Sequence, residues 1–255
     1  MSTYVITGAS SGIGLELVNQ LAARGDKVYA TCRKLESSAT GEDLLSSVVG
    51  DITIIDGIDV STDECKTALS SALSGVEIDV IMHNAGGLSG ERLPGDAQSM
   101  MGDQTLEAVS SERMLAAFQL NTLGPLRVQQ ALNGQMRSPG GKVCVISTGM
   151  SSIADNGSGG IYAYRASKSA VNMITKGMSV DLKERGIAVV AAAPGMVVTQ
   201  FVSSPETMAA MGGVSVELSC AGLIKIVDEL SVETTGRFMT VPKDGSPPKD
   251  FPAGW

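Results

Sequence analysis

The chain has 255 residues, a formal net charge of −8 and an isoelectric point near 4.7, which disfavours binding to nucleic acid or to an anionic membrane surface. No apolar stretch reaches the roughly 18 residues that a membrane-spanning helix requires. Hydrophobic residues make up 43% of the chain and aromatic residues only 4%, so we expect an aliphatic core, as in buried parallel strands.

Strand-like and helix-like patterns alternate along the whole chain. The predicted strands are Thr3–Thr7, Lys27–Cys32, Thr53–Ile58, Val80–Met82, Val143–Ile146, Ala188–Ala193 and Phe238–Val241. The predicted helices are one that follows the first strand and ends near Arg24, and then Cys65–Leu73, Glu112–Asn121, Leu126–Met136, Tyr164–Arg185 and Val216–Leu230. This alternation predicts an α/β fold, a single Rossmann-type domain over residues 1–255. Its doubly wound parallel sheet has about seven strands in the order 3-2-1-4-5-6-7, with helices on both faces.

A glycine-rich turn joins the first predicted strand to the first predicted helix. It contains Gly8, Gly12 and Gly14, with Ser10, Ser11 and Ile13 between them. Glycines let the backbone approach phosphate oxygens closely, and the start of a helix offers free N–H donors and a positive dipole end. The spacing is G-x-x-x-G-x-G and not the commoner G-x-G-x-x-G, so an ordinary strand-to-helix turn remains the alternative to a pyrophosphate site.

Three stretches follow strands four, five and six and match no regular element: Gly86–Met101, Ser151–Gly160 and Pro194–Gly213. In an open α/β sheet such loops line the ligand crevice, so we expect the substrate to bind there. The tail Lys243–Trp255 contains three prolines and is expected to be neither helix nor central strand.

Tyr164 and Lys168 form a Tyr-x-x-x-Lys pair on one face of a predicted helix. An ammonium group at about 4 Å, at an effective dielectric constant near 20, favours the phenolate by roughly 4 kcal/mol, or about 3 pKa units. The pair therefore predicts a phenol that exchanges a proton with a carbonyl or alcohol oxygen. A chance pair on an amphipathic helix is the alternative.

The four cysteines are scattered, and none forms a C-x-x-C pair. We therefore expect no disulfide, no metal site and a reducing cytoplasmic location. His83 is the only histidine, which makes a Ser-His-Asp hydrolase and a multi-histidine metal site poor interpretations.

Taken together, the order of the motifs resembles the short-chain dehydrogenase/reductase family over essentially the whole chain. The motifs are Thr7-Gly8-x-x-x-Gly12-x-Gly14, His83-Asn84-Ala85-Gly86, Asn121 within Leu-Asn-Thr, Tyr164-x-x-x-Lys168 and Pro194-Gly195. Within that family the chain is similar to C-factor-like and Sniffer-type carbonyl reductases. This finer likeness is in Ser152–Asn156, Gly159–Arg165 and the ending Asp244-Gly245…Trp255.

The resemblance implies a catalytic group. Tyr164 would give the proton to a carbonyl in reduction, or act as the base in oxidation. Lys168 would lower the pKa of Tyr164 and hold the ribose hydroxyls of the nicotinamide nucleotide. Asn121 would fix a water in the proton relay.

The hydroxyl that orients the carbonyl follows strand five in this family. Thr148 takes the family position here, where a serine is usual, and its hydroxyl can donate the same hydrogen bond. Its methyl group restricts the side chain, and Ser147 and Ser151 remain rivals for the role.

The resemblance also implies cofactor contacts beyond the glycine turn. They are Asn84, Ala85 and Gly86 along the cofactor, Asp59 and Val60 at the adenine, and Pro194, Gly195, Val197 and Thr199 at the nicotinamide, besides Tyr164 and Lys168. His83 replaces the first asparagine of the family's Asn-Asn-Ala-Gly motif, which is expected to alter a structural hydrogen bond and not the chemistry.

The end of the second strand bears on the choice of cofactor. An acidic residue there accepts the ribose hydroxyls of NAD, whereas a basic one accommodates the 2′-phosphate of NADP. This chain has Cys32 where an NAD enzyme carries aspartate, and Arg33 follows it. A guanidinium can hold a phosphate with two parallel hydrogen bonds. The sequence therefore favours NADP(H) over NAD(H).

These inferences predict an NADPH-dependent oxidoreductase that reduces a ketone or aldehyde of a small molecule, reversibly. Its partners would be that carbonyl substrate and further copies of the chain, in a homodimer or homotetramer, with no nucleic acid, membrane or metal. The alternative is a signalling protein, similar to C-factor, that binds NAD(P) without significant turnover. A sugar-nucleotide epimerase or dehydratase is a weaker alternative, because it would usually need a larger C-terminal region.

Overall fold

The structure, a computed structural model, describes residues 1–33, 45, 47–88, 103–199 and 205–255. These residues contain one sheet of eight strands. The strands are β1 (Thr3–Thr7), β2 (Lys27–Thr31), β3 (Ile52–Ile55), β4 (Val80–His83), β5 (Lys142–Ile146), β6 (Ala188–Ala193), β7 (Arg237–Thr240) and β8 (Lys249–Asp250). Their order is β3-β2-β1-β4-β5-β6-β7-β8, and all neighbouring pairs are parallel except β7 and β8. The predicted fold and strand order are therefore confirmed, with one strand added.

The added strand lies in the tail that the sequence left irregular. Lys249 and Asp250 pair with β7 at the edge of the sheet, antiparallel to it. Prolines are tolerated at an edge, because no further strand has to receive a hydrogen bond from them. A two-residue strand has no periodicity, so the sequence pattern could not show it. The third strand was predicted over Thr53–Ile58, whereas β3 spans Ile52–Ile55. The N–H of Ile58 donates to the carbonyl oxygen of Cys32, but Ile58 lies outside β3.

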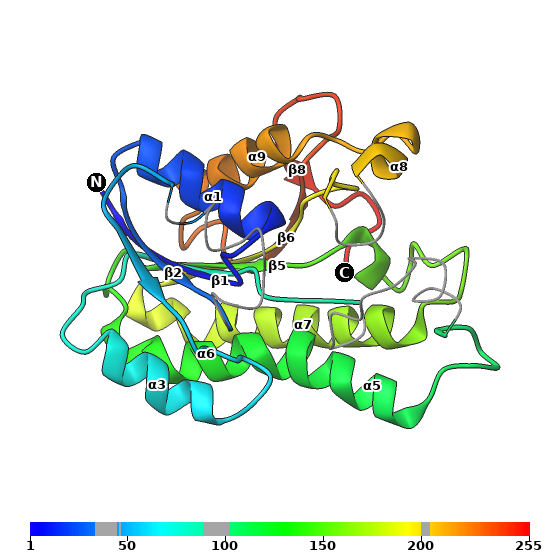
Figure 1. The fold of residues 1–255 in the computed structure, drawn as a ribbon, viewed down its shortest axis with the longest axis horizontal. Coiled ribbons are helices and arrows are strands. Elements are labelled where there is room, and N and C mark those ends of the chain that lie inside the picture. Colours follow the sequence, from blue (N-terminus) through cyan, green and yellow to red (C-terminus); the bar gives the residue numbers. More distant parts are fainter. Residues whose placement is uncertain (34–44, 46, 89–102, 200–204) are drawn as a thin grey trace.

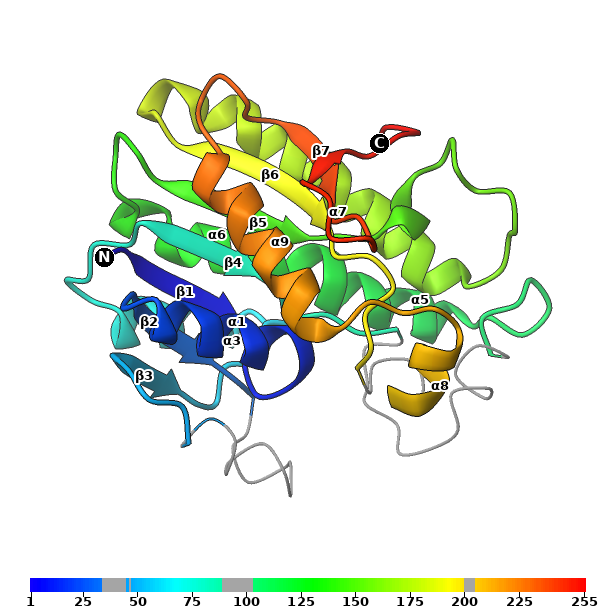
Figure 2. The same ribbon diagram turned by 90° about the horizontal axis from the view of Figure 1, so that it is seen from above.

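Helices cover both faces of this sheet (Figures 1 and 2). They are α1 (Gly12–Ala23), α3 (Glu64–Ala72), α5 (Ser111–Phe118), α6 (Gly124–Leu132), α7 (Tyr162–Asp181), α8 (Pro205–Ala210) and α9 (Val216–Glu229). Short 3-10 turns occupy Asn133–Gln135, Gly149–Ser151 and Lys183–Arg185. α1 and α9 lie on one face, and α3, α5, α6 and α7 lie on the other (Figure 1).

The alternation of side chains along the strands divides the core into two layers. Ile6 and Met82 pack with α1 and α9, whereas their neighbours Val5 and Ile81 pack with α3, α6 and α7. Both layers are dominated by aliphatic side chains, as the composition predicts. Burial on both faces explains why these strands are continuously hydrophobic and show no polar alternation.

The helix predicted over Glu112–Asn121 and the one predicted over Leu126–Met136 form one bent rod. A π-helical turn, Gln119–Leu123, joins α5 to α6. Pro125 near the start of α6 has no N–H, so it cannot donate the α-helical hydrogen bond to the carbonyl of Asn121. The wider turn places Asn121 inside the protein, where it is completely buried.

The catalytic-motif helix α7 starts two residues before Tyr164 and ends earlier than predicted. Gly159, Gly160 and Ile161 precede it with φ of 62°, 63° and 51°, a left-handed turn that is uncommon for a β-branched residue. After Asp181 the chain continues through a 3-10 turn to Gly186, whose φ of 68° ends the helical path.

Candidate active site

The predicted catalytic residues gather where β4 and β5 end. A Cβ atom at Gly86, in the loop after β4, would lie 3.0 Å from Asn121 Oδ1 and 3.4 Å from Lys168 Nζ. Lys168 Nζ in turn donates to the carbonyl oxygen of Ile146, the last residue of β5, at 2.7 Å. Four separate segments therefore meet at the carboxyl ends of these strands, and a side chain at position 86 would crowd them.

Tyr164 and Lys168 are both buried on the same face of α7, with exposed fractions of 7% and 5%. Lys168 Nζ lies 5.9 Å from the centre of the Tyr164 ring. Burial raises the pKa of Tyr164 to about 12, and a side-chain hydrogen bond with Thr148 counteracts part of that rise. Burial also lowers the pKa of Lys168 to about 8.

In the protein alone the pKa of this phenol is thus raised, and a lowering of that pKa by Lys168 stays a prediction. Loss of water destabilises the phenolate, and the ammonium group is bound to a main-chain carbonyl and not to the phenol oxygen. A neutral phenol still carries the proton at neutral pH. That is the form required of a group that gives a proton to a carbonyl oxygen.

The hydroxyl groups after β5 have different neighbours. Thr148 shares the hydrogen bond with Tyr164, and its Oγ1 also accepts from the main-chain N of Met150 at 3.2 Å. Ser147 and Ser151 are both buried, and their hydroxyls contact Asn172 at 2.6 and 2.7 Å. Of the three candidates from the sequence, Thr148 is the one the structure places beside the phenol.

Asn121 fastens the π-helical turn to the loop after β4. Its Oδ1 accepts from the N–H of Gly87 at 2.9 Å, and its Nδ2 donates to the carbonyl of Gly87 at 2.8 Å. Nδ2 also donates to Ser167 Oγ at 3.0 Å, which connects the turn to α7. The side chain thus ties together the segments on either side of the Tyr164–Lys168 pair.

The glycine turn is shaped as a bare backbone cradle at the start of α1. A Cβ at Gly14 would lie 2.2 Å from the carbonyl oxygen of Gly8, and one at Gly8 would lie 2.9 Å from Ala85 Cα. Asn84 Nδ2 holds the turn by donating to the carbonyls of Thr7 and Gly8 at 3.0 and 3.1 Å. The first turn of α1 contains no acidic residue, so nothing in it repels an anion. These features fit a dinucleotide, whose pyrophosphate would be held by this turn.

The other predicted cofactor residues border the same edge. Ser10, Ser11 and Ile13 are partly exposed in the glycine turn, and Thr199 lies beside Gly12. Val60 packs against Gly124. After β6, the carbonyl of Pro194 accepts from Ser219 Oγ, Gly195 has a φ of 86°, and Val197 pairs with Val214. Asp59 instead turns its carboxylate to the N–H and hydroxyl of Ser61, at 2.9 and 2.6 Å. It shapes the chain at the expected adenine position.

Cys32 and Arg33, the residues predicted to select the cofactor, directly follow β2. Cys32 is buried, and its backbone bonds to Ile55 and Ile58. Arg33 is exposed, so its guanidinium is accessible to a ligand. The residues that follow Arg33 lie outside the described residues, as do most of the predicted loop Gly86–Met101 and five residues of Pro194–Gly213.

His83 occupies a sealed position behind the site. It is 2% exposed, and its Nε2 lies 3.3 Å from Gln129 Oε1. Among the residues that the structure describes, its Nδ1 has no hydrogen-bond partner. Burial lowers the pKa of His83 to about 4, so the ring is neutral at ordinary pH. The ring thus makes a buried hydrogen bond to a helix that covers the sheet, with Gln129 of α6.

Two buried polar residues at this site were not predicted from the sequence. Gln104 is completely buried, and its Oε1 accepts from the main-chain N of Tyr164 at 3.1 Å while its Nε2 donates to the carbonyl of Leu88. It replaces the side-chain cap that Ile161 cannot provide at the start of α7. Asn172 is the other, and its spacing of four residues after Lys168 on the same helix face was a usable signal.

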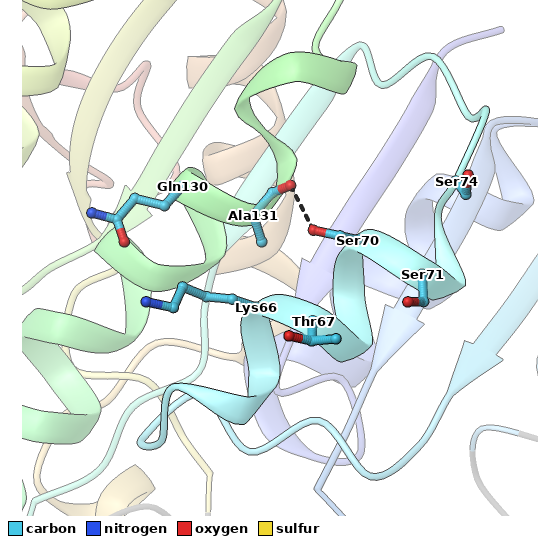
Figure 3. A pocket seen from close by; sticks show the side chains of 7 residues that line it. All are labelled: Lys66, Thr67, Ser70, Ser71, Ser74, Gln130 and Ala131. Carbon is cyan, nitrogen blue, oxygen red and sulfur yellow. Dashed lines mark hydrogen bonds between the residues drawn. The ribbon is translucent and has the colours of Figure 1, made fainter.

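A separate surface depression of about 510 Å³ lies between α3 and α6 (Figure 3). It is lined by Lys66, Thr67, Ser70, Ser71, Ser74, Gln130 and Ala131. Ser70 Oγ donates to the carbonyl of Ala131 at 3.0 Å across it. None of the predicted site residues lines this depression. No group of three or more potential metal ligands occurs among the described residues, and none of the described helices is long and apolar enough to cross a membrane.

Sequence comparison finds relatives along most of the chain. A profile of the short chain dehydrogenase family matches residues 2–210. The chain is 34% identical over 240 residues to a 1-hydroxy-2-glutathionyl-2-methyl-3-butene dehydrogenase of Rhodococcus sp. strain AD45, covering 93% of this chain and 96% of the relative. It is 36% identical over 162 residues to C-signal of Myxococcus xanthus, covering 63% of this chain and 87% of the relative.

Solved structures with the same fold include carbonyl reductases. The NADPH-bound carbonyl reductase from chicken fatty liver superimposes with a TM-score of 0.82 and 26% identity, over 100% of this chain and 99% of the other. The carbonyl reductase Sniffer of D. melanogaster superimposes with a TM-score of 0.76 and 26% identity, over 98% of this chain and 100% of the other.

Proposed function

The chain belongs to the short chain dehydrogenase family, as its motifs led us to expect, and on that premise we propose that it is an NADP(H)-dependent carbonyl reductase. The observation that carries the proposal is the meeting of Tyr164, Lys168, Thr148 and Asn121 at the ends of β4 and β5. Its substrate would be the ketone or aldehyde of a small molecule, and the reverse reaction would oxidise an alcohol.

Each polar side chain has a role in the proposed reaction. When bound, NADPH supplies the hydride that reduces the carbonyl carbon. Tyr164 gives its phenolic proton to the carbonyl oxygen as negative charge develops there. Thr148 donates a hydrogen bond to that oxygen and so fixes the carbonyl beside the phenol. Lys168 supplies positive charge near the phenolate that remains, which its position under the ring supports.

The backbone around β1 would hold the dinucleotide. The N–H groups of the first turn of α1 would bind the pyrophosphate. Asn84 contacts that turn through Gly8, and Lys168 lies beside the Tyr164 ring, so both would contact the bound cofactor. Arg33 would bind the 2′-phosphate, and Cys32 brings no charge against it. The NADPH-bound structural relative supports this choice of cofactor.

An assay of NADPH consumption across a panel of aldehydes and ketones tests the proposal. Wild-type protein should turn over at least one carbonyl, and Tyr164→Phe should slow that reaction by about 10²- to 10⁴-fold while NADPH still binds. Retention of more than about a tenth of the wild-type rate by the variant would remove Tyr164 from the mechanism. If NADPH binds but is not consumed with any carbonyl of the panel, the result would favour the alternative. That alternative is a signalling protein, as the name of the relative C-signal indicates, which binds NADP(H) without significant turnover.

The exposed surface of α7 favours a second copy of the chain as a binding partner. Tyr162, Met173 and Val180 are exposed apolar side chains on one stripe of this helix, and Gly177 lies in the same stripe. Leu115 is exposed on the neighbouring helix α5. We propose that two chains pack along this stripe, and light scattering of the purified protein would contradict it by giving the mass of a monomer.

The state of the cysteines supports the proposed cytoplasmic location. Cys32, Cys65, Cys144 and Cys220 are all free thiols and all buried. Burial raises the pKa of each thiol above its ordinary value, so none is poised to react. A reducing compartment suits such a set.

A further inference from the structure

Asn172 follows Tyr164 and Lys168 along the inner face of α7 at successive intervals of four residues. It is 3% exposed and takes no part in the proposed reaction. Its Oδ1 accepts from Ser147 Oγ at 2.6 Å, and its Nδ2 donates to Ser151 Oγ at 2.7 Å. A buried amide with both ends bonded to one neighbouring segment has a defined orientation.

The directions of these hydrogen bonds form a chain that ends on Thr148. Ser151 Oγ accepts from Asn172 and gives its own proton to the carbonyl oxygen of Thr148 at 2.6 Å. Each hydroxyl has only one proton to donate. Ser147 donates its proton to Asn172 Oδ1, and Ser151 donates its proton to the carbonyl oxygen of Thr148. The two serines are 2% and 1% exposed, so water cannot replace a missing partner without entering the core.

The same segment carries the hydroxyl that faces the phenol. Thr148 adopts an extended conformation, with φ of −159° and ψ of 151°, immediately before the 3-10 turn Gly149–Ser151. Its backbone is held by Ser151, and its side chain reaches Tyr164. Fixing the Thr148 carbonyl therefore also fixes where its hydroxyl lies relative to the phenol.

We propose that Asn172 is a positioning residue, which acts through Ser151 to hold the Thr148 hydroxyl against the reacting carbonyl oxygen. The inference rests on the proposed function, because it gives a catalytic purpose to the placement of Thr148. Loss of the amide lets the turn relax, and a displacement of about 1 Å can lower a rate by roughly 10²-fold.

The first experiment compares Asn172→Ala and Ser151→Ala with the wild type in the carbonyl reduction assay. Both variants should lower kcat by about tenfold to a hundredfold while the Kd for NADPH stays within about twofold. Ser151→Ala removes a single oxygen atom, so it provides a folded variant if Asn172→Ala is unstable. Thr175→Val is the matched control, because Thr175 is equally buried on α7 but its hydroxyl donates to Val171 within the helix.

A double-mutant cycle with Thr148→Ala separates positioning from general damage to the fold. If Asn172 acts through Thr148, adding Asn172→Ala to Thr148→Ala should lower kcat by less than about twofold further. Full multiplication of the two effects would overturn the proposal, and so would a kcat within twofold of the wild type for both Asn172→Ala and Ser151→Ala. A harmless Thr148→Ala would sink the role assigned to Thr148 in the proposed function together with this inference.

Discussion

Replacement of His83 by asparagine should change how the stability of the protein depends on pH. The imidazole is sealed in the core and pairs with Gln129, and protonation would add a second N–H at Nδ1, which has no partner among the described residues. Asparagine is the residue that the family resemblance would place there, and it does not titrate. The difference between the two proteins therefore isolates the titration of His83, the only histidine of the chain.

The size of the effect follows from the pKa of His83, which burial lowers from 6.5 to about 4. The unfolded chain takes up a proton near pH 6.5, whereas the folded protein does not until about pH 4. The part of the wild-type stability that depends on a neutral His83 is therefore fully present above pH 6.5 and is lost as the pH falls towards 4. At about 1.36 kcal/mol for each pKa unit, the loss is about 2 kcal/mol by pH 5 and about 3 kcal/mol by pH 4.

Urea unfolding of both proteins, at about pH 7.5 and about pH 5, measures this difference. Contributions from carboxyl groups occur in both proteins and cancel in the comparison. The advantage of wild type over His83→Asn should shrink by about 2 kcal/mol between the two conditions. A change smaller than about 0.5 kcal/mol would show that His83 titrates near its ordinary pKa in the folded protein, and that the ring is reached by water.

Two further predictions concern the site itself. Thr148→Ala should lower kcat by about 10²-fold or more while Thr148→Ser retains most of it, because the hydroxyl and not the methyl group orients the carbonyl; steady-state reduction rates check this, and equal loss in both variants would contradict it. Cys32→Asp combined with Arg33→Ala should weaken NADPH binding by more than the 10- to 150-fold expected for one charge-assisted contact, since that contact is worth about 1.5–3 kcal/mol. The same change should improve the use of NADH, and unmodified protein that uses NADH as well as NADPH would show that Arg33 does not meet the phosphate.

The parallel part of the sheet could be predicted from the sequence because most of its strands are short, rich in aliphatic residues and bounded by turn residues. The bounds of Thr3–Thr7 and Ala188–Ala193 agree with β1 and β6, since Gly8 ends the first run and Pro194 ends the second. The break between α5 and α6 agrees with the two separate helices predicted there, but the π-helical turn that joins them could not be predicted, because it places Asn121 against Gly87, which lies far away in the sequence.

The site shows a similar division. The spacing of Tyr164 and Lys168 places both on one helix face, and this is a local property that the sequence carries. Their pKa values are not local, because they depend on how completely the surrounding elements exclude water. Gln104 was missed for the same reason, since its partners Leu88 and Tyr164 become neighbours only in the folded chain.

The π-helical turn Gln119–Leu123 gives a single residue in this region unusual weight. A π turn accommodates one residue more than an α-helical turn of the same height, so deletion of one residue would let α5 and α6 merge into a continuous helix. The merged helix would have better hydrogen-bond geometry and would keep the faces of α5 and α6 in phase, but the widened turn that carries Asn121 inward would be gone. Asn121 would then leave Gly87 and Ser167, and the loop after β4 would lose its attachment to α7. A one-residue gap at this place in an aligned relative therefore indicates a rebuilt site and not a harmless change of length.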